Sequence, residues 1–513
     1  MASARRLSAH GAARRTPLFL LLAGIGSAAM LVPAAHGFLI GEADDGRPFL
    51  QAAILFTVLI ALTALASAAA PRRRPEAGQL LALLGTFALV PLMLAVPLRE
   101  VAPGATFLNA YLEMVSALTT TGATFFPAPG ALSETAHVWR ATVGWGGGLL
   151  MWVAAAAILT PMNLGGIEVA AGMPAWRGAR NEDRGLRLDD PSGRLARTAR
   201  ALVPLYAGLT AALFVALLVL GERPLVAFCH ALSTLATSGI SPVGGLSGGA
   251  AGIPGEAAVA VFLVFALSRS TFDRAARARA GGILADPELR LAAGLVGTVA
   301  LLLFVRHFAG AGGGLRWSEV PAALAALWGG AFTALGFLST AGWASADWEI
   351  ARDWSGLGAP GLTLMGLALF GGGIATTAGG VKLFRCYALM QHGLREMDRL
   401  SHPSSIGGSG ARARRIRRQG AYAAWIFFML FALSVAAVTL ALSATGIIFE
   451  DALILTIAAL CNVGPLTQFA GDSAVGWAAM TDVGKLIAGA AMVLGRLEAL
   501  AILALIDPER WRA

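Results

Sequence analysis

Four short stretches decide the fold of this chain: TTTG at 119–122, ATSG at 236–239, STAG at 339–342 and CNVGP at 461–465. Each follows a short, half-hydrophobic segment and lies between two apolar segments long enough to cross a bilayer. The chain therefore repeats one pattern four times: a span, a short segment, a turn of small residues and a second span.

The composition indicates a membrane protein. Of the 513 residues, 57% are hydrophobic and only 13% are charged, whereas a soluble protein carries about 25% charged residues. The apolar residues come in long runs rather than in alternating patterns, which is typical of transmembrane helices. No soluble domain fits between the runs, because even the longest polar stretches, 174–200 and 393–419, are short.

The net charge of +9 reflects membrane topology, and we expect no nucleic-acid partner. Basic residues crowd into particular loops, and the loops between them hold few. This alternation is the positive-inside pattern, so we place the basic loops and both termini in the cytoplasm. The basic clusters extend over Arg5–Arg15, Arg72–Arg74, Arg177–Arg200, Arg269–Arg279 and Arg395–Arg418.

We predict ten spans in an all-α polytopic membrane protein. Two spans lead the chain, and the first is interpreted as a retained helix rather than a signal peptide, because a second span follows at once. Four pairs of spans come next, each enclosing one short segment. The predicted spans are 17–38 and 49–70, then 78–98 with 138–161, 200–221 with 254–270, 289–309 with 358–391, and 420–446 with 482–506.

The spans predict two leading helices and four helix–pore-helix–helix repeats around one central pore. The short segments, 106–121, 223–238, 320–341 and 448–463, are too short or too interrupted to be clean spans. Non-helical backbone at membrane depth is tolerated only where protein buries it or a wet cavity receives it, so we expect their turns to line a pore. The predicted units are 1–77 for the two leading transmembrane helices and 78–199, 200–288, 289–419 and 420–513 for pore repeats 1 to 4.

The turns have the composition that a cation filter requires. A dehydrated ion needs oxygen ligands in place of its water shell, and backbone carbonyls supply them when the chain twists. Glycine permits the torsion angles that this twist demands, and a half-helix whose C-terminus faces the cavity adds negative potential. The alternative is that the glycines cap helices in an ordinary transporter bundle. The glycines are Gly122, Gly239, Gly342 and Gly464.

A second glycine-rich stretch, GGGIATTAGGVK at 371–382, interrupts the predicted span 358–391. Each glycine costs a helix roughly 1 kcal/mol relative to alanine, so five of them predict an unwound section. Below a filter, a loop at 371–380 could obstruct the permeation path and move to open it. The alternative is a packing motif of small residues between helices. The glycines of this predicted gate are Gly371, Gly372, Gly373, Gly379 and Gly380.

Two ionisable residues, Arg496 and Glu498, lie inside the last predicted span. Such a residue faces a partner or water, and we predict that Arg496 contacts carbonyls of the glycine-rich loop and holds it closed. The alternatives are an Arg496–Glu498 pair that only stabilises packing, or snorkelling to the interface. We include Lys382 in the gating set because it follows the loop directly, although Lys382 and Arg385 could also be cytoplasmic anchors.

Other polar residues have a weaker link to function. Asn109, Glu113 and His230 lie in the short segments, where polar side chains often bond neighbouring backbone. The chain has no HExxH motif, no GxSxG elbow and no convincing acid–base pair, so we predict that it is not an enzyme. The alternative from another class is a polytopic membrane enzyme or sensor in which the four turns are coincidental.

These motifs resemble those of the Trk/Ktr/HKT superfamily of potassium transporters, specifically its bacterial Trk-type membrane subunits (TrkH). The pore regions of that family are similar to YLEMVSALTTTGAT at 111–124, CHALSTLATSGIS at 229–241, FLSTAGW at 337–343 and NVGP at 462–465. The glycine-rich loop, HGLRE at 392–396 and GRLE at 495–498 also fit, so the resemblance covers nearly the whole chain.

The resemblance implies potassium uptake across the bacterial inner membrane by a homodimer. It also implies K⁺ as the transported ion, no cofactor on this chain, and a cytosolic nucleotide-binding regulatory subunit of the TrkA type. By the same resemblance, the coordinating carbonyls are those of Thr120, Thr121, Thr237, Ser238, Thr340, Ala341, Asn462 and Val463.

Selectivity follows from the same resemblance. Glycine at all four filter positions is similar to the potassium-selective members, whereas Ser in the first repeat accompanies sodium preference in some plant relatives. Ala341 stands where Thr is usual and Trp343 where Phe is common. A sodium-preferring or weakly selective cation pathway is therefore the alternative within the superfamily.

Overall fold

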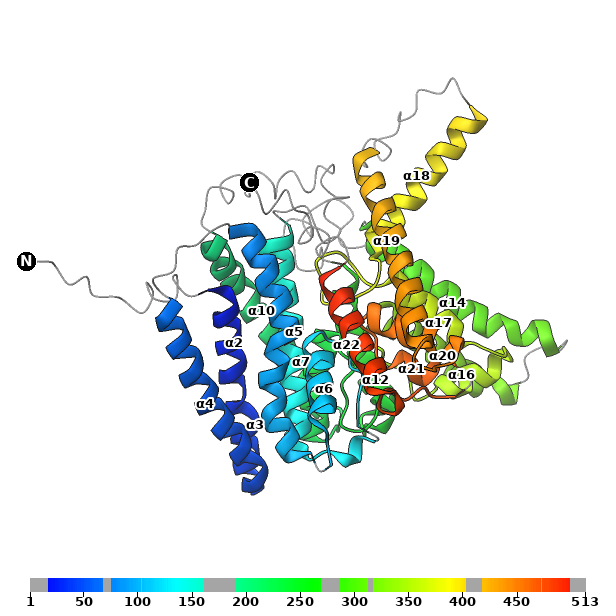
Figure 1. Ribbon diagram of the computed structural model, residues 1–513. Helices are drawn as coiled ribbons and strands as arrows, with labels where there is room; N and C mark the ends of the chain where they lie inside the picture. Colours follow the sequence, from blue (N-terminus) through cyan, green and yellow to red (C-terminus); the bar gives the residue numbers. More distant parts are fainter. Residues whose placement is uncertain are drawn as a thin grey trace, which may run out of the picture.

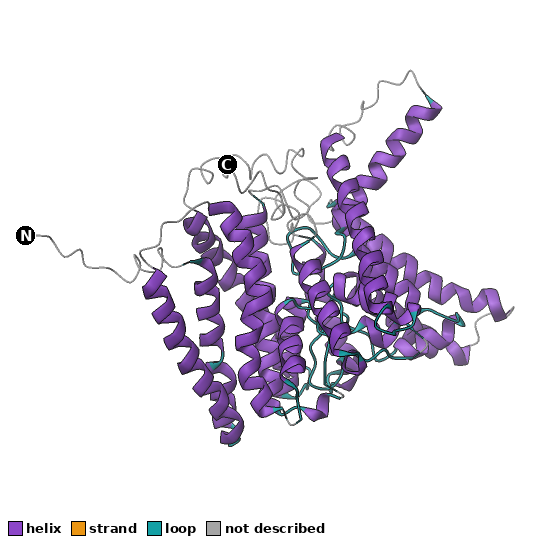
Figure 2. Cartoon of the chain, in the orientation of Figure 1, coloured by secondary structure: helices purple, strands orange, loops and turns teal. Residues whose placement is uncertain are grey.

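The computed structural model describes residues 17–67, 75–102, 104–126, 128–160, 191–268, 286–311, 317–402, 418–471 and 473–498. Within these residues every regular element is helical, and Figure 2 draws no strand among them. The predicted all-α class is therefore confirmed. The basic clusters Arg5–Arg15, Arg72–Arg74 and Arg269–Arg279, with most of Arg177–Arg200 and Arg395–Arg418, lie outside the described residues.

Eight of the described helices are long and apolar enough to cross a membrane, where ten spans were predicted. One of the eight, Trp317–Leu338, was predicted to be a short pore segment; its Ala- and Leu-rich sequence instead continues as a helix of spanning length. The others match predicted spans.

Three predicted second spans fall short of that length. The segment 254–270 is the helix α12 (Gly252–Leu267), which has 16 residues. The segment 358–391 is broken into α17 (Gly361–Phe370) and α18 (Leu383–Ser401), because the glycine-rich stretch between them is not helical. The last, α22 (Asp482–Leu497), ends early, and the predicted remainder to 506 lies beyond the described residues.

The leading helices lie on one side of the molecule, drawn in blue in Figure 1. α2 (Leu18–Ala29) runs into α3 (Leu31–Leu39), and α4 (Ala43–Ser67) folds back along both. Glycine permits the close crossing of α3 and α4, because a Cβ at Gly37 would lie 2.8 Å from the backbone nitrogen of Gly46. The pair packs on the first repeating unit through α5 (Pro75–Val101) and α7 (Glu134–Ala154).

Four units of similar helix order follow. Each has a long first helix, a second helix that ends in one of the four turns, and a third helix; the second helix is short in three units and of spanning length in the third unit. The first unit is α5 (Pro75–Val101), α6 (Phe107–Leu118) and α7 (Glu134–Ala154), the second α10 (Pro191–Val219), α11 (Pro224–Ala236) and α12, the third α14 (Pro287–Ala311), α15 (Val320–Leu338) and α17, and the fourth α19 (Arg418–Ser443), α20 (Phe449–Leu460) and α22.

The predicted unit boundaries at 200 and 289 fall inside helices. α10 begins at Pro191 and α14 at Pro287. Proline is favoured in the first turn of a helix because its missing N–H and fixed φ cost nothing there. The hydrophobic runs alone placed these helix starts too late, because polar first turns precede the apolar residues.

The four units close into a ring. The third helix of each unit packs against the second helix of the next one: α7 against α11, α12 against α15, α17 against α20, and α22 against α6. This cyclic order brings the four turns together, although they are far apart in the sequence. α18 continues from the third unit and projects away from the bundle (Figure 1).

Candidate functional site

The short helices start at defined positions and end at the turns. The side chain of Thr106 caps α6 by accepting a hydrogen bond from the Asn109 amide at 3.2 Å. α11 begins with Pro224 in its first turn. Acidic residues in the first turn of α20, Glu450 and Asp451, favour its N-terminus. The N-termini of α6, α11 and α20 are therefore fixed, and each of these helices ends at one of the turns in the ring.

All four turns share one unusual torsion angle. The residue two positions before each glycine has a positive φ: 56° at Thr120, 53° at Thr237, 57° at Thr340 and 53° at Asn462. A left-handed conformation costs an L-residue roughly 1–2 kcal/mol, so packing must hold these residues in place. The sequence predicts a twist at each glycine but not at the residue two positions earlier, because threonine gives no signal for positive φ.

The glycines themselves have positive φ in three of the four turns. The angles are 72° at Gly122, 64° at Gly239 and 71° at Gly342, which confirms the torsional reason for glycine there. Gly464 does not have a positive φ, so the torsional reason expected for it is wrong. Space requires glycine instead, because a Cβ at Gly464 would collide with the backbone nitrogen of Ala123.

The open side of each glycine faces a neighbouring turn. A Cβ atom added at any of the four positions would meet atoms of the next turn at distances that real Cβ atoms do not show. The turns are thus packed in the cyclic order of the units, with backbone against backbone in three of the four contacts. The contacts join Gly122 to the Ser238 carbonyl oxygen, Gly239 to the Ala341 carbonyl oxygen, Gly342 to the Pro465 ring and Gly464 to Ala123.

Hydrogen bonds close the ring between the fourth and first turns. The Gly464 amide donates to the Thr121 carbonyl oxygen at 2.6 Å. The Asn462 side-chain amide donates to the Thr121 hydroxyl at 2.9 Å and to the Met492 carbonyl oxygen at 3.0 Å. Met492 lies on α22, so Asn462 ties its own third helix to the first turn.

The turns are buried. The two residues that directly precede each of the four glycines have at most 1% of their surface exposed. Their backbone and hydroxyl oxygens are therefore separated from bulk solvent, which is the setting in which oxygens can replace an ion's water shell. The structure brings all twelve predicted filter residues into one site: Thr120, Thr121, Gly122, Thr237, Ser238, Gly239, Thr340, Ala341, Gly342, Asn462, Val463 and Gly464.

The glycine-rich stretch is an unwound loop that touches three units. The Gly379 amide donates to the Thr340 hydroxyl in the third turn at 2.7 Å. The Thr377 hydroxyl donates to the Leu235 carbonyl oxygen of α11 at 3.2 Å. A Cβ at Gly379 would collide with the carbonyl oxygen of Cys461 in the fourth unit. The loop therefore lies directly against the ring, and the alternative of a helix-packing motif does not describe it.

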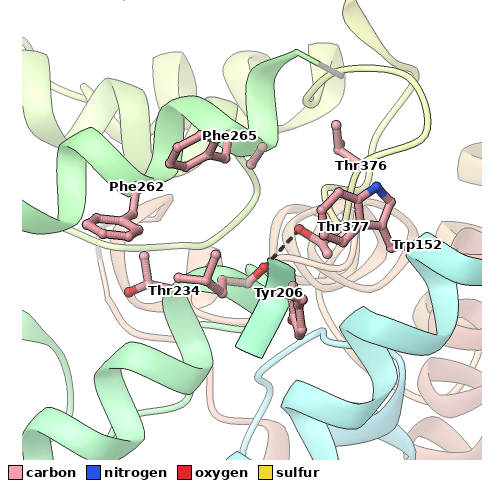
Figure 3. Close-up of a pocket in the computed structure, with 9 residues that line it drawn as sticks. Trp152, Tyr206, Thr234, Phe262, Phe265, Thr376 and Thr377 are labelled. Carbon is pink, nitrogen blue, oxygen red and sulfur yellow. Dashed lines mark hydrogen bonds between the residues drawn. The ribbon is translucent and has the colours of Figure 1, made fainter. Parts of the chain in front are cut away.

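Cavities lie beside the loop. One is lined by Trp152, Tyr206, Thr234 and Phe262 together with Thr376 and Thr377 of the loop. Figure 3 shows their side chains around this space, with the hydrogen bond of the Thr377 hydroxyl drawn as a dashed line. A second cavity, lined in part by Gly380 and Glu498, borders the C-terminal end of the loop. Small cavities thus lie beside the middle of the loop and beside its C-terminal end.

Arg496 contacts this loop, as predicted. Its Nη1 donates to the Thr377 carbonyl oxygen at 2.7 Å, and only 3% of the residue is exposed, which excludes snorkelling to the interface. Glu498 instead accepts from Arg385 Nη2 at 2.6 Å. The expected alternative of an Arg496–Glu498 pair is therefore wrong, because residues two apart do not share a helix face and Glu498 lies past the end of α22.

Lys382 and Arg385 are not cytoplasmic anchors. Arg385 is fully buried, and its guanidinium lies 3.7 Å from the centre of the Phe427 ring. Lys382 is also buried, and its ammonium group donates to the Ala378 carbonyl oxygen inside the loop. The glycine-rich loop lacks helical hydrogen bonds, so some of its backbone carbonyls need other donors. The buried cations beside the loop supply such donors.

The polar residues of the short helices have mixed roles. Glu113 accepts from the Phe125 amide at 2.7 Å, as expected, but also pairs with Arg140 Nε at 2.6 Å. Asn109 and His230 bond side chains rather than backbone: Asn109 Oδ1 accepts from Lys485 Nζ at 3.0 Å, and His230 Nε2 lies 2.9 Å from the Ser241 hydroxyl.

The sequence does not predict the acidic residues that accept hydrogen bonds from the segments following the turns. Glu222 accepts from the amides of Arg223, Ala250 and Ala251 in the second unit. Burial raises the pKa of Glu222, but these three amide donors together hold the pKa below its ordinary value. Glu256 has a similar arrangement with the third unit. No motif marks such residues, because their partners lie in other segments of the chain.

Known proteins are similar to this chain along most of its length. A family profile described as TrkH, cation transport protein, matches residues 315–508. The Trk system potassium uptake protein TrkH of Vibrio parahaemolyticus is 30% identical over 428 residues, or 80% of this chain and 81% of that protein. The protein of the same name from Escherichia coli K12 is 30% identical over 417 residues, 80% of each.

The fold agrees with a solved structure. The crystal structure of the potassium transporter TrkH from Vibrio parahaemolyticus matches with a TM-score of 0.78 at 25% sequence identity. The match covers 97% of this chain and 99% of that one.

Proposed function

Because the chain belongs to the TrkH family of cation transport proteins, we propose that it takes up potassium ions through the ring formed by its four turns. The observation that carries this proposal is the cyclic contact of the four glycines with neighbouring turns. The names of the similar proteins, Trk system potassium uptake proteins, support potassium as the ion. Four pore repeats, close to 78–199, 200–288, 289–419 and 420–513, surround the pore.

The ion is bound by backbone oxygens. Burial of the turns makes their carbonyls a substitute for the water shell of a potassium ion. The glycines keep the ring narrow because no side chain fits between neighbouring turns. The coordinating carbonyls are those of Thr120, Thr121, Thr237, Ser238, Thr340, Ala341, Asn462 and Val463.

The loop 371–380 acts as the gate. It is held by Arg496 at Thr377 and by Thr340 at Gly379, so opening requires the loss of both hydrogen bonds. Lys382 fixes the end of the loop through Ala378.

The gate and the filter are joined by the Thr340 hydroxyl group. Because the Thr340 hydroxyl belongs to a filter residue and holds a loop amide, movement of the loop removes a restraint on the third turn. Opening of the gate and ion binding in the filter are therefore energetically coupled.

The protein works in the bacterial inner membrane as a homodimer with both termini in the cytoplasm. A cytosolic nucleotide-binding regulatory subunit of the TrkA type controls the gate. Eight apolar helices support a multi-pass membrane protein.

Rubidium uptake into proteoliposomes tests the proposed transport. The purified protein is assayed with sodium as competitor, beside Gly122→Ser, which places a side chain against the Ser238 carbonyl. We expect uptake that resists sodium in the wild type and loses this resistance in the variant. Equal uptake of both ions by the wild type would favour the weakly selective alternative.

Arg496→Gln tests the gate in the same assay. The variant loses the charged donor to Thr377, so we expect faster rubidium uptake with unchanged sodium resistance. Arg352→Gln, at an exposed arginine of α16 (Trp348–Ser355), is the matched control. Uptake that is unchanged or slower in Arg496→Gln would contradict the gating role.

A further inference from the structure

Glu256 is a buried acid in an otherwise uncharged helix. It is the one charged residue of α12, whose sequence is GIPGEAAVAVFLVFAL, and only 2% of its surface is exposed. A buried carboxylate in an apolar helix carries a large desolvation cost unless donors satisfy it. Its partners therefore indicate what it does.

Among the described residues, Glu256 has three hydrogen-bond donors, and all three belong to the next unit. Oε2 accepts from the Trp328 indole N–H on α15 at 2.7 Å and from the Ser345 hydroxyl at 2.7 Å. Oε1 accepts from the Ala346 amide at 2.6 Å. The second unit thus holds the segment that leaves the third turn just after Gly342.

The held segment is itself packed tightly against α15. Cβ atoms at Gly336 and Gly329 would collide with the carbonyl oxygens of Trp343 and Asp347. The Ser345 amide donates to the Thr333 hydroxyl at 3.1 Å. A shift of Ser345 is therefore transmitted to the turn rather than absorbed by a loose loop.

The third turn is thus held at both ends. The loop amide of Gly379 bonds Thr340 at the beginning of the turn, and Glu256 bonds the residues that follow its end. A comparable acid in the first unit, Glu113, is neutralised by Arg140. Among the residues that the structure describes, Glu256 forms no ion pair with Lys or Arg, and its two carboxyl oxygens are satisfied by the three hydrogen-bond donors.

We propose that Glu256 is a positioning residue that sets the ion selectivity of the filter by fixing the outgoing end of the third turn. This inference rests on the proposed potassium transport. The carboxylate is required because all three partners are donors. A glutamine would place an NH₂ group against at least one of them and leave a buried donor unpaired.

Glu256→Gln in proteoliposomes tests this role, with rubidium uptake measured against increasing sodium. Because the substitution removes a hydrogen bond that fixes the outgoing end of the turn, we expect the sodium concentration that halves uptake to fall roughly tenfold. Glu349→Gln makes the same chemical change on exposed α16 of the third unit and should behave as wild type. Ser345→Ala removes one donor and should shift the sodium concentration in the same direction by less.

The sodium dependence separates this role from a merely structural one. A variant that only folds poorly would lower the amount of active protein and the maximal rate, with the half-inhibitory sodium concentration unchanged. That result in Glu256→Gln and Ser345→Ala would overturn the inference. A wild type without sodium-resistant uptake would instead overturn the proposed function itself.

Discussion

The first three turns and the fourth reach the same ring by different backbone routes. In the first three, both the threonine and the glycine have positive φ. In the fourth, Asn462 has positive φ and Gly464 does not. The left-handed residue of the fourth turn is an asparagine, whereas those of the other three turns are threonines. Asparagine tolerates this conformation better than most residues other than glycine. Equivalent positions in a pseudo-symmetric ring can thus require glycine for torsion, for space, or for both.

The difference in φ between the turns shows where the backbone strain of the site lies. Threonine is poorly suited to positive φ, so the first three turns are held by their neighbours rather than by local preference. The fourth turn is locally more relaxed, and its side chain serves to bind the first turn and α22. Substitutions that affect torsion, space or side-chain bonds separately can test this division.

We expect the largest loss of uptake at a glycine whose substitution both strains the backbone and creates a collision. Gly239→Ala strains a φ of 64° and places a methyl group 2.5 Å from the Ala341 carbonyl oxygen. We expect rubidium uptake to be lost almost completely, as measured in proteoliposomes with protein of normal size-exclusion profile. Gly130→Ala, at an exposed glycine with open space around it, is the control. Near-normal selective uptake by Gly239→Ala would show that the turns do not pack as described.

Gly342 and Gly464 separate collision with a side chain from collision with backbone. The three atoms nearest to a methyl group at Gly342 would belong to the Pro465 ring, whereas those nearest to one at Gly464 would be backbone of the first turn and Ala123. We therefore expect Pro465→Ala to restore part of the uptake lost in Gly342→Ala, because two of the three ring atoms are removed, while the contact with Cβ and the torsional cost of roughly 1–2 kcal/mol remain. The same second substitution should not rescue Gly464→Ala. Equal rescue of both would refute the spatial distinction.

A smaller effect is expected at the left-handed residues. Asn462→Ala removes two side-chain hydrogen bonds, which contribute about 0.5–1.5 kcal/mol each, and we expect a lower melting temperature in detergent with a modest loss of sodium resistance. Thr120→Ala is the matched control in the first turn. Its hydroxyl has no hydrogen-bond partner among the described residues, so the melting temperature should fall less. A larger fall in Thr120→Ala would contradict the account.

Much of this architecture was predictable from the sequence. Apolar runs predicted the first helices of all four units, and five glycines predicted the break between α17 and α18. The contact of Arg496 with the loop followed from the cost of burying a charge inside a span. These features have local causes, which a single sequence displays.

The missed features have non-local causes. The positive φ of Thr340 and the spatial reason for Gly464 arise from packing between turns of different units. Glu256 satisfies donors about ninety residues further along the chain, as its bond to the Ala346 amide shows. The Ser339–Gly342 turn predicts a short segment before it, but α15 and the turn of helix that precedes it reach spanning length, from Trp317 to Leu338.

The most direct test of the central claim is to locate the ion. Crystals grown in rubidium, with sodium present in excess, would be measured at the rubidium absorption edge. The account predicts an anomalous peak enclosed by the four turns, close to the carbonyl oxygens of the residues before Gly122, Gly239, Gly342 and Gly464. A well-ordered ring without a peak, or a peak only at another site, would contradict it.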